Sequence, residues 1–153
     1  MAYRATQAVA PILDQIDTVA AFPFGTRFEA ADGAYVYIKG ITSGALGAWV
    51  TFHPVTGVSA LLAANAIGNV GIMMSVLDAN TKFGWIQVKG YNTTSKSDTT
   101  AAGAALYIDA TAGRVDDAVV TGDLVANAFS TAADTTNVLP VYINNPFVTD
   151  TLS

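Results

Sequence analysis

Residues 83–94 read FGWIQVKGYNTT, a stretch that alternates as a β-strand does. The side chains of a β-strand point alternately to its two faces. Ile86 and Val88 therefore share one face, which is aliphatic and typical of a protein core. The other face carries two aromatic and two long polar side chains: Trp85, Gln87, Lys89 and Tyr91. The stretch predicts a strand with one core face and one face that contacts a neighbour.

Turn residues punctuate the sequence before this strand. Asp32-Gly33 predicts a hairpin, because this dipeptide readily adopts the tight turn between two strands. The following residues, AYVYIK (34–39), are apolar on both faces, as in a strand that is buried on both sides. Pro54 predicts the end of the strand in AWVTFHPV, because proline cannot donate a ladder hydrogen bond.

The rest of the chain continues this pattern of short strands. Residues 69–80 predict a strand with four inward side chains: Val70, Ile72, Met74 and Val76. Residues 106–120 predict two short strands joined by an ATAG turn, another strand surrounds Val125, and VLPVYINNPFV (138–148) predicts the last. Segment 58–67 fits a helix or a strand. About eight to ten short strands predict an all-β protein, a compact β-barrel or sandwich.

The first 22 residues differ from this β-rich region. They contain no glycine, and Ile12, Leu13, Ile16 and Val19 recur at helical spacing. The segment fits a short helix, an extended arm that lies on a neighbour, or a frayed terminus. We expect an N-terminal arm over residues 1–22 and a single β-rich domain over residues 23–153.

Composition indicates an assembled protein. Charged residues make up 12% of the 153 residues, about half the usual share of about 25%, and hydrophobic residues make up 52%. Such a chain exposes apolar surface after its core is filled, and large exposed apolar patches mark interfaces. The seven basic residues are scattered and the net charge is −5, so no nucleic-acid partner is expected. Asn65 and Asn69 interrupt the most apolar stretch, so no membrane span is expected either.

The sequence offers little for catalysis. His53 is the only histidine, Glu29 is the only glutamate, and there is no cysteine. The adjacent Asp116 and Asp117 would point to opposite faces of a strand, although residues 115–123 leave a structural cation open. No glycine-rich phosphate motif occurs. We therefore expect no catalytic, cofactor-binding or metal-binding residues and no enzyme activity. Trp49 and Trp85 fit a core, an interface or a platform for sugar rings.

Five motifs in order give the chain a family resemblance. PFGTRFEAADGAYVYIKG, GAWVTF, FGWIQVKG, AALYIDATAGRVDD and NNPFV span residues 22 to 148. In this order they resemble the small head decoration, or cement, proteins of tailed bacteriophages. The resemblance implies a β-rich homotrimer that binds the major capsid protein on the outer surface of the virion. It also implies assembly in the bacterial cytoplasm, binding at threefold and quasi-threefold positions, and stabilisation of the shell against the pressure of packaged DNA.

The family carries no fixed interface motif, so the expected contact residues come from the local patterns above. The residues expected at the capsid or subunit interface are Tyr3, Ile12, Leu13, Ile16, Phe22, Phe24, Trp49, Trp85, Gln87, Tyr91 and Phe147. Two alternatives stay open. One is a β-sandwich module that binds glycans through Trp49 and Trp85, with weak glycan contact also compatible with a decoration protein. The other is a different virion component, such as a head fibre base, a tail tube or a capsid subunit.

Overall fold

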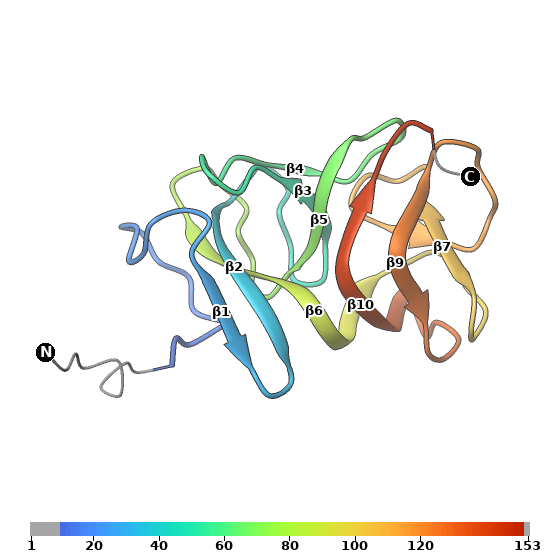
Figure 1. The fold of residues 1–153 in the computed structure, drawn as a ribbon, viewed down its shortest axis with the longest axis horizontal. Helices are drawn as coiled ribbons and strands as arrows, with labels where there is room; N and C mark the ends of the chain where they lie inside the picture. The colour runs from blue at the N-terminus through green and yellow to red at the C-terminus, as the bar shows by residue number, and fades with distance from the viewer. Residues whose placement is uncertain (1–9, 152–153) are drawn as a thin grey trace, which may run out of the picture.

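A computed structural model describes residues 10–151, and within this range the chain contains ten β-strands and no helix (Figure 1). The prediction of an all-β fold with eight to ten short strands is therefore confirmed. The strands are β1 (Arg27–Ala30), β2 (Gly33–Lys39), β3 (Trp49–Phe52), β4 (Ser59–Leu61), β5 (Gly68–Met73), β6 (Phe83–Lys96), β7 (Ala105–Ile108), β8 (Val115–Asp116), β9 (Leu124–Ser130) and β10 (Val138–Val148).

The strands form one antiparallel sheet that does not close. Its order is β1-β2-β6-β5-β10-β9-β7-β8, with β3 paired to β5 and β4 paired to β3. Strand β6 is the hub, because its first half pairs with β2 and its second half pairs with β10. Figure 1 shows β1 and β2 at one end of the molecule, β7 and β9 at the other end, and β6 between them.

Gly90 marks the point where β6 changes partner. Its φ is +112°, in the region that glycine adopts at little cost, and a Cβ at this position would collide with the carbonyl oxygen of Asp32. Gly90 pairs with Gly33 of β2 on one side and with Ile143 of β10 on the other. The long strand seen in the sequence is thus one strand that serves two parts of the sheet.

The two faces of the β2–β6 pair are both covered. Val36 and Ile86 lie opposite each other and face a cluster of buried aliphatic side chains, to which Val88 also belongs. Tyr37 and Trp85 lie opposite each other and face the other side. The predictions that Ile86 and Val88 fill the core and that residues 34–39 are buried on both faces are confirmed.

A larger aliphatic cluster fills the opposite end of the molecule. It joins side chains of β5, β7, β9 and β10, among them Ile72, Leu106, Val125 and Ile143. Transfer of aliphatic side chains from water into such a cluster is the main favourable term in folding. The segments with alternating aliphatic residues in the second half of the sequence are therefore held together by this cluster.

The structure corrects several local expectations. Segment 12–19 is not helical, because the backbone of Asp17 pairs with that of Phe83 in both directions, at 2.8 and 2.9 Å. Of the helix and the strand left open for segment 58–67, the strand is present as β4, followed by a turn in which Asn65 has a φ of +61°. Strand β5 ends at Met73, so Val76 lies beyond it and is exposed rather than inward.

The turn predictions are closer to the structure. The β1–β2 hairpin is present, but its two-residue turn is Ala31-Asp32, one position earlier than predicted, because Ala30 pairs with Gly33. Strand β3 ends at Phe52, just before Pro54, as predicted. Strands β7 and β8 are joined across the predicted ATAG turn. No helix within the described residues is long and apolar enough to cross a membrane.

Candidate binding surface

Segment 10–22 covers an aromatic cluster on the chain's own surface. Tyr37 and Trp85 meet edge to face with ring centroids 5.2 Å apart, and Phe22 packs 5.3 Å from each of them. The Tyr37 hydroxyl donates a 2.6 Å hydrogen bond to Asp17 Oδ2 and accepts one of 3.1 Å from the backbone N–H of Ala21. The segment is thus held to the body by ring packing and by one shared hydroxyl.

Two tyrosines of the cluster have raised pKa values. Burial, and then the hydrogen bond to Asp17, raises the pKa of Tyr37 to about 12. Burial, and then the nearby Asp32 carboxylate, also raises the pKa of Tyr35. Tyr37 therefore keeps its proton, and with it the hydrogen bond to Asp17, well above physiological pH.

Three residues that were expected to lie on a contact face are buried inside the chain. Trp49 lies in the large aliphatic cluster, and its Nε1 has no hydrogen-bond partner among the described residues. Trp85 lies under segment 10–22. Gln87 is buried too, and its Nε2 donates to the carbonyls of Lys89 and Tyr91 at 3.1 and 3.2 Å. Their expected surface position is wrong. Of the three interpretations left open for Trp49 and Trp85, the structure shows the core position.

The other expected contact residues divide into three groups. Ile12, Ile16 and Phe22 are exposed on segment 10–22, while Tyr91 and Phe147 are exposed on β6 and β10. Two more, Leu13 and Phe24, are partly buried against the aromatic cluster. Tyr3 lies outside the described residues.

Three exposed rings form an aromatic ladder across neighbouring strands. Tyr142 of β10 lies directly opposite Tyr91 of β6 and directly opposite Phe129 of β9. Directly opposite residues in an antiparallel pair share a face. The Phe129 and Tyr142 ring centroids are 5.9 Å apart with planes tilted by 35°. The exposed fractions are 55% for Tyr91, 40% for Tyr142 and 48% for Phe129.

Local sequence patterns indicate only one of these three rings, Tyr91, as a contact residue. Tyr142 alternates with the buried Val141 and Ile143, so its outward direction could have been inferred from the final strand alone. Phe129 gave no such signal, because β9 turns irregularly at Asn127, where φ is +61°. No local sequence pattern indicates the strand pairing that brings the three rings together.

A hollow of about 360 Å³ adjoins the ladder. Tyr91 and Tyr142 form one wall, and the β1–β2 hairpin forms the other. The hairpin contributes Glu29 and Asp32 to its lining, and β6 contributes Lys89. An exposed aromatic surface therefore borders directly on hydrogen-bonding groups of both kinds.

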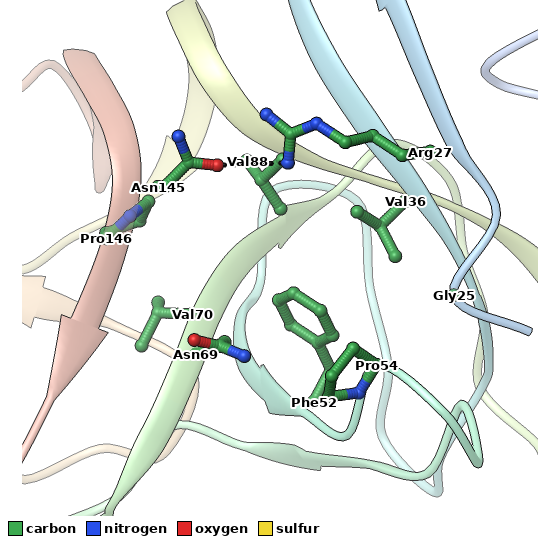
Figure 2. Close-up of a pocket in the computed structure, with 10 residues that line it drawn as sticks. All are labelled: Gly25, Arg27, Val36, Phe52, Pro54, Asn69, Val70, Val88, Asn145 and Pro146. Atoms are coloured by element: carbon green, nitrogen blue, oxygen red, sulfur yellow. Dashed lines mark hydrogen bonds between the residues drawn. The ribbon is translucent and has the colours of Figure 1, made fainter.

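A second hollow, of about 290 Å³, lies between β1, β5 and β10 (Figure 2). Three buried valines, Val36, Val70 and Val88, contribute to its apolar lining. Arg27 reaches across the opening toward Asn145, and Phe52 stands on the opposite side in Figure 2. This combination of an apolar lining and a few polar groups is common in small-molecule sites.

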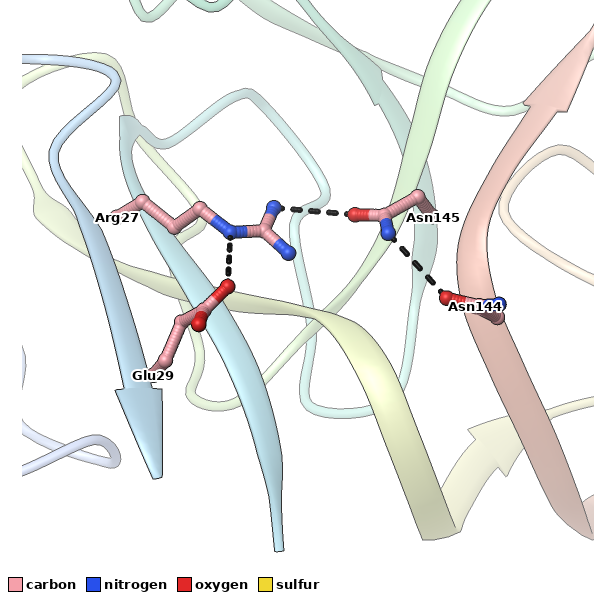
Figure 3. Close-up of polar contacts among 4 residues, drawn as sticks. All are labelled: Arg27, Glu29, Asn144 and Asn145. Carbon is pink, nitrogen blue, oxygen red and sulfur yellow. Dashed lines mark hydrogen bonds and ion pairs between the residues drawn. The ribbon is translucent and has the colours of Figure 1, made fainter. Parts of the chain in front are cut away.

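Four hydrogen-bonded side chains form a polar bridge between β1 and β10 (Figure 3). Arg27 Nε donates to Glu29 Oε1 at 3.0 Å, and Arg27 Nη1 donates to Asn145 Oδ1 at 3.0 Å. Asn145 Nδ2 in turn donates to Asn144 Oδ1 at 3.3 Å. Glu29 lines the hollow beside the ladder and Arg27 lines the other, so the bridge lies between the two hollows. The ladder, the bridge and the two hollows are together called the groove below.

Strand β10 positions its half of the bridge by an irregularity. Asn145 has a φ of +49°, and the pairing between β10 and β9 shifts register between Ile143 and Phe147. Asparagine tolerates this left-handed conformation better than most residues. The irregularity turns Asn145 toward Arg27, whereas a regular strand would alternate Asn144 and Asn145 between opposite faces.

The remaining polar candidates serve local structure. Nδ1 of His53 accepts hydrogen bonds from the backbone N–H groups of Val55 and Thr56, both at 3.2 Å, so the imidazole stabilises a turn. Asp116 and Asp109 lie close together, and burial raises the pKa of Asp116. Within residues 10–151, no three His, Asp or Glu side chains gather in a geometry that suits a metal ion.

The groove and the outer side of segment 10–22 are therefore the two surfaces with features suited to binding. Comparison with known proteins adds no relative to this picture: no protein-family model, no curated protein and no solved structure matches the chain.

Proposed function

We propose that this chain is a structural protein of a tailed-bacteriophage virion, a trimeric decoration protein that binds the outside of the head. Its partner is the major capsid protein, at threefold and quasi-threefold positions, and its role is to strengthen the shell against internal DNA pressure. The ordered motifs described above support this proposal, as do the all-β fold and the low charge content.

One observation carries the proposal: segment 10–22 turns aliphatic side chains toward solvent. Val19 is 80% exposed and Ile12 is 64% exposed, with Ile16 and Phe22 beside them in sequence. The same segment uses Leu13 and Phe22 to pack on the aromatic cluster. A segment that is held to the body and also exposes several aliphatic side chains is suited to contact a second protein.

Linked contacts explain how such a protein would strengthen a shell. A trimer presents three copies of the segment, so the second and third contacts form at high effective concentration once the first is made. A protein that binds only the assembled, expanded shell stabilises that state by mass action. No catalytic step is required for this role.

Sedimentation with expanded phage heads tests the proposal. The double variant Ile12→Ser/Val19→Ser removes the two most exposed aliphatic side chains of the segment, and Val119→Ser is the matched control on the loop between β8 and β9. We expect the double variant to pellet with heads much less than the wild type, and the control to pellet normally. The proposal would be contradicted if all three proteins pelleted equally with heads, or if the wild type did not pellet with heads at all.

Electron microscopy of decorated heads separates this role from those of other virion components. We expect density at threefold and quasi-threefold positions of the shell. Density confined to the tail or to a head fibre would assign the chain to the alternative class of virion protein.

A further inference from the structure

The groove differs in chemistry from the apolar side of segment 10–22. It combines three exposed rings with a hydrogen-bonded polar bridge and two hollows. We propose that the groove binds a neutral oligosaccharide, with sugar rings stacked on the aromatic ladder and hydroxyl groups bonded to the polar bridge.

The ladder supplies a broad stacking surface. Tyr91, Tyr142 and Phe129 come from three adjacent strands in direct register, so their spacing is set by the sheet rather than by flexible loops. The face of an aromatic ring carries negative charge density, which attracts the weakly positive C–H groups on the face of a pyranose ring. Three rings in a row suit a chain of sugars better than a single small molecule.

The bridge supplies groups that match hydroxyls. A hydroxyl group both donates and accepts hydrogen bonds, so it pairs best with donors and acceptors placed side by side. Arg27 offers donors, Glu29 offers acceptors, and the amides of Asn144 and Asn145 offer both. Because these side chains already bond one another, a ligand would meet groups that are largely ordered beforehand, which lowers the entropy cost of binding.

The charge balance favours a neutral ligand. Two cationic side chains, Arg27 and Lys89, stand with two carboxylates, Glu29 and Asp32, around the groove. Nucleic acids stack on aromatic surfaces as well, but their binding depends on an excess of basic residues. The chain carries a net charge of −5, so a polyanion is disfavoured.

This inference stands apart from the proposed function because it uses the other face of the sheet. Arg27 and Glu29 lie opposite Val36 and Ala34 on β2, whereas segment 10–22 covers Tyr37 on the reverse face of the same strand. Each surface can therefore be altered without touching the other.

Nuclear magnetic resonance titration of the full chain tests the inference. The probes are short neutral cello-, malto-, chito- and manno-oligosaccharides, with a heparin oligosaccharide and a short oligothymidylate as charged comparisons. We expect at least one neutral probe to shift the ring signals of Tyr91, Tyr142 and Phe129 in a saturable way, and neither charged probe to do so. The inference is overturned if no neutral probe shifts these signals, if the shifts fall elsewhere, or if the polyanions bind equally well.

Variants of the ladder then locate the contact. Tyr142→Ala should weaken binding of the best neutral probe about tenfold, because it removes the middle ring of the stacking surface. Tyr142→Phe keeps the ring and should retain most of the affinity, and Val119→Ala is the unaffected surface control. Equal affinity of Tyr142→Ala and the wild type would overturn the assignment, provided that circular dichroism shows both proteins folded.

The same variants separate the two proposals. If Tyr142→Ala binds phage heads normally and loses the sugar, both proposals stand. If Tyr142→Ala instead loses head binding and no sugar binds the wild type, the groove is a protein interface and the oligosaccharide inference fails, while the proposed decoration role survives.

Discussion

The two halves of strand β6 carry aromatic side chains that differ in burial. Trp85, in the first half, is 2% exposed beneath Phe22 and beside Tyr37. Tyr91, six positions later, is 55% exposed beside Tyr142. Both are large amphipathic side chains on one continuous strand, yet the chain covers only one of them. Residue type and strand pattern therefore do not decide burial here, and the presence of a covering segment does.

The two aromatic groups also differ in their neighbours. The covered cluster is joined to segment 10–22 by a hydroxyl shared between Asp17 and Ala21. The uncovered ladder borders charged and amide side chains that bond one another. We expect the first group to govern stability and the second to govern binding, and four predictions test this division.

The largest difference is expected between truncation of Trp85 and truncation of Tyr91. Trp85→Ala leaves a cavity beneath segment 10–22 and should lower the free energy of unfolding by about 3–5 kcal/mol. Tyr91→Ala changes an exposed side chain and should stay within about 0.5 kcal/mol of the wild type. Urea unfolding measures both values, and similar losses for the two variants would contradict the division.

Alkaline pH should weaken the covered cluster. The pKa of Tyr37 is raised to about 12 in the folded chain, so at pH 10–12 the folded state keeps a proton that the unfolded state has lost. Stability should be full below pH 10 and should fall by on the order of 2 kcal/mol as the pH rises to 12.

The control for this pH dependence is Tyr37→Phe. It should show a shallower decline, and the decline that remains should reflect Tyr35, whose pKa is also raised. Thermal unfolding across this range supplies the measurement. Identical slopes for the wild type and Tyr37→Phe would show that the Tyr37 hydroxyl does not contribute.

At neutral pH, removal of the shared hydroxyl should have a moderate effect. Tyr37→Phe leaves the Ala21 N–H and the Asp17 carboxylate without this partner and should cost about 1–2 kcal/mol. Hydrogen exchange at Ala21 should become faster in the variant. The matched control is Tyr142→Phe, which removes a hydroxyl from the uncovered ladder and should leave exchange at Ala21 unchanged.

Local sequence patterns predicted the parts of the fold that depend on residues close together in the chain. Alternation correctly predicted that Ile86 and Val88 are buried, because an aliphatic face nearly always turns inward. The β1–β2 hairpin and the turn between β7 and β8 followed from short runs of turn-forming residues. Each of these features depends on residues that are close together in the sequence.

Features that depend on distant pairing were not predictable in the same way. The burial of Trp85 depends on a segment more than sixty positions earlier, and that of Trp49 on a cluster drawn from six strands. The aromatic ladder requires the register of β6, β10 and β9. Helical spacing at residues 12–19 was misleading, because the segment forms only a turn at residues 13–14 and is held to the body by a backbone pair with Phe83 and the bond to Tyr37.

The smallest effect on stability is expected at the polar bridge. Arg27→Ala removes an ion pair that is largely open to solvent and should cost less than about 1 kcal/mol. Lys82→Ala, which breaks the exposed pair with Asp78, is the matched control and should cost a similar amount. The two variants should differ in oligosaccharide titrations, where only Arg27→Ala loses affinity. A large loss of stability in Arg27→Ala alone would make the bridge a structural element instead.

The mass of the purified chain in solution decides whether the exposed apolar side chains of segment 10–22 belong to an assembled protein. Light scattering over a wide concentration range should give three times the chain mass of 15.8 kDa. The Ile12→Ser/Val19→Ser variant should keep the fold, because both side chains are exposed, and its mass shows whether they contribute to the trimer or only to the shell contact. A wild-type mass of 15.8 kDa at every concentration would contradict the trimeric decoration protein proposed for this chain.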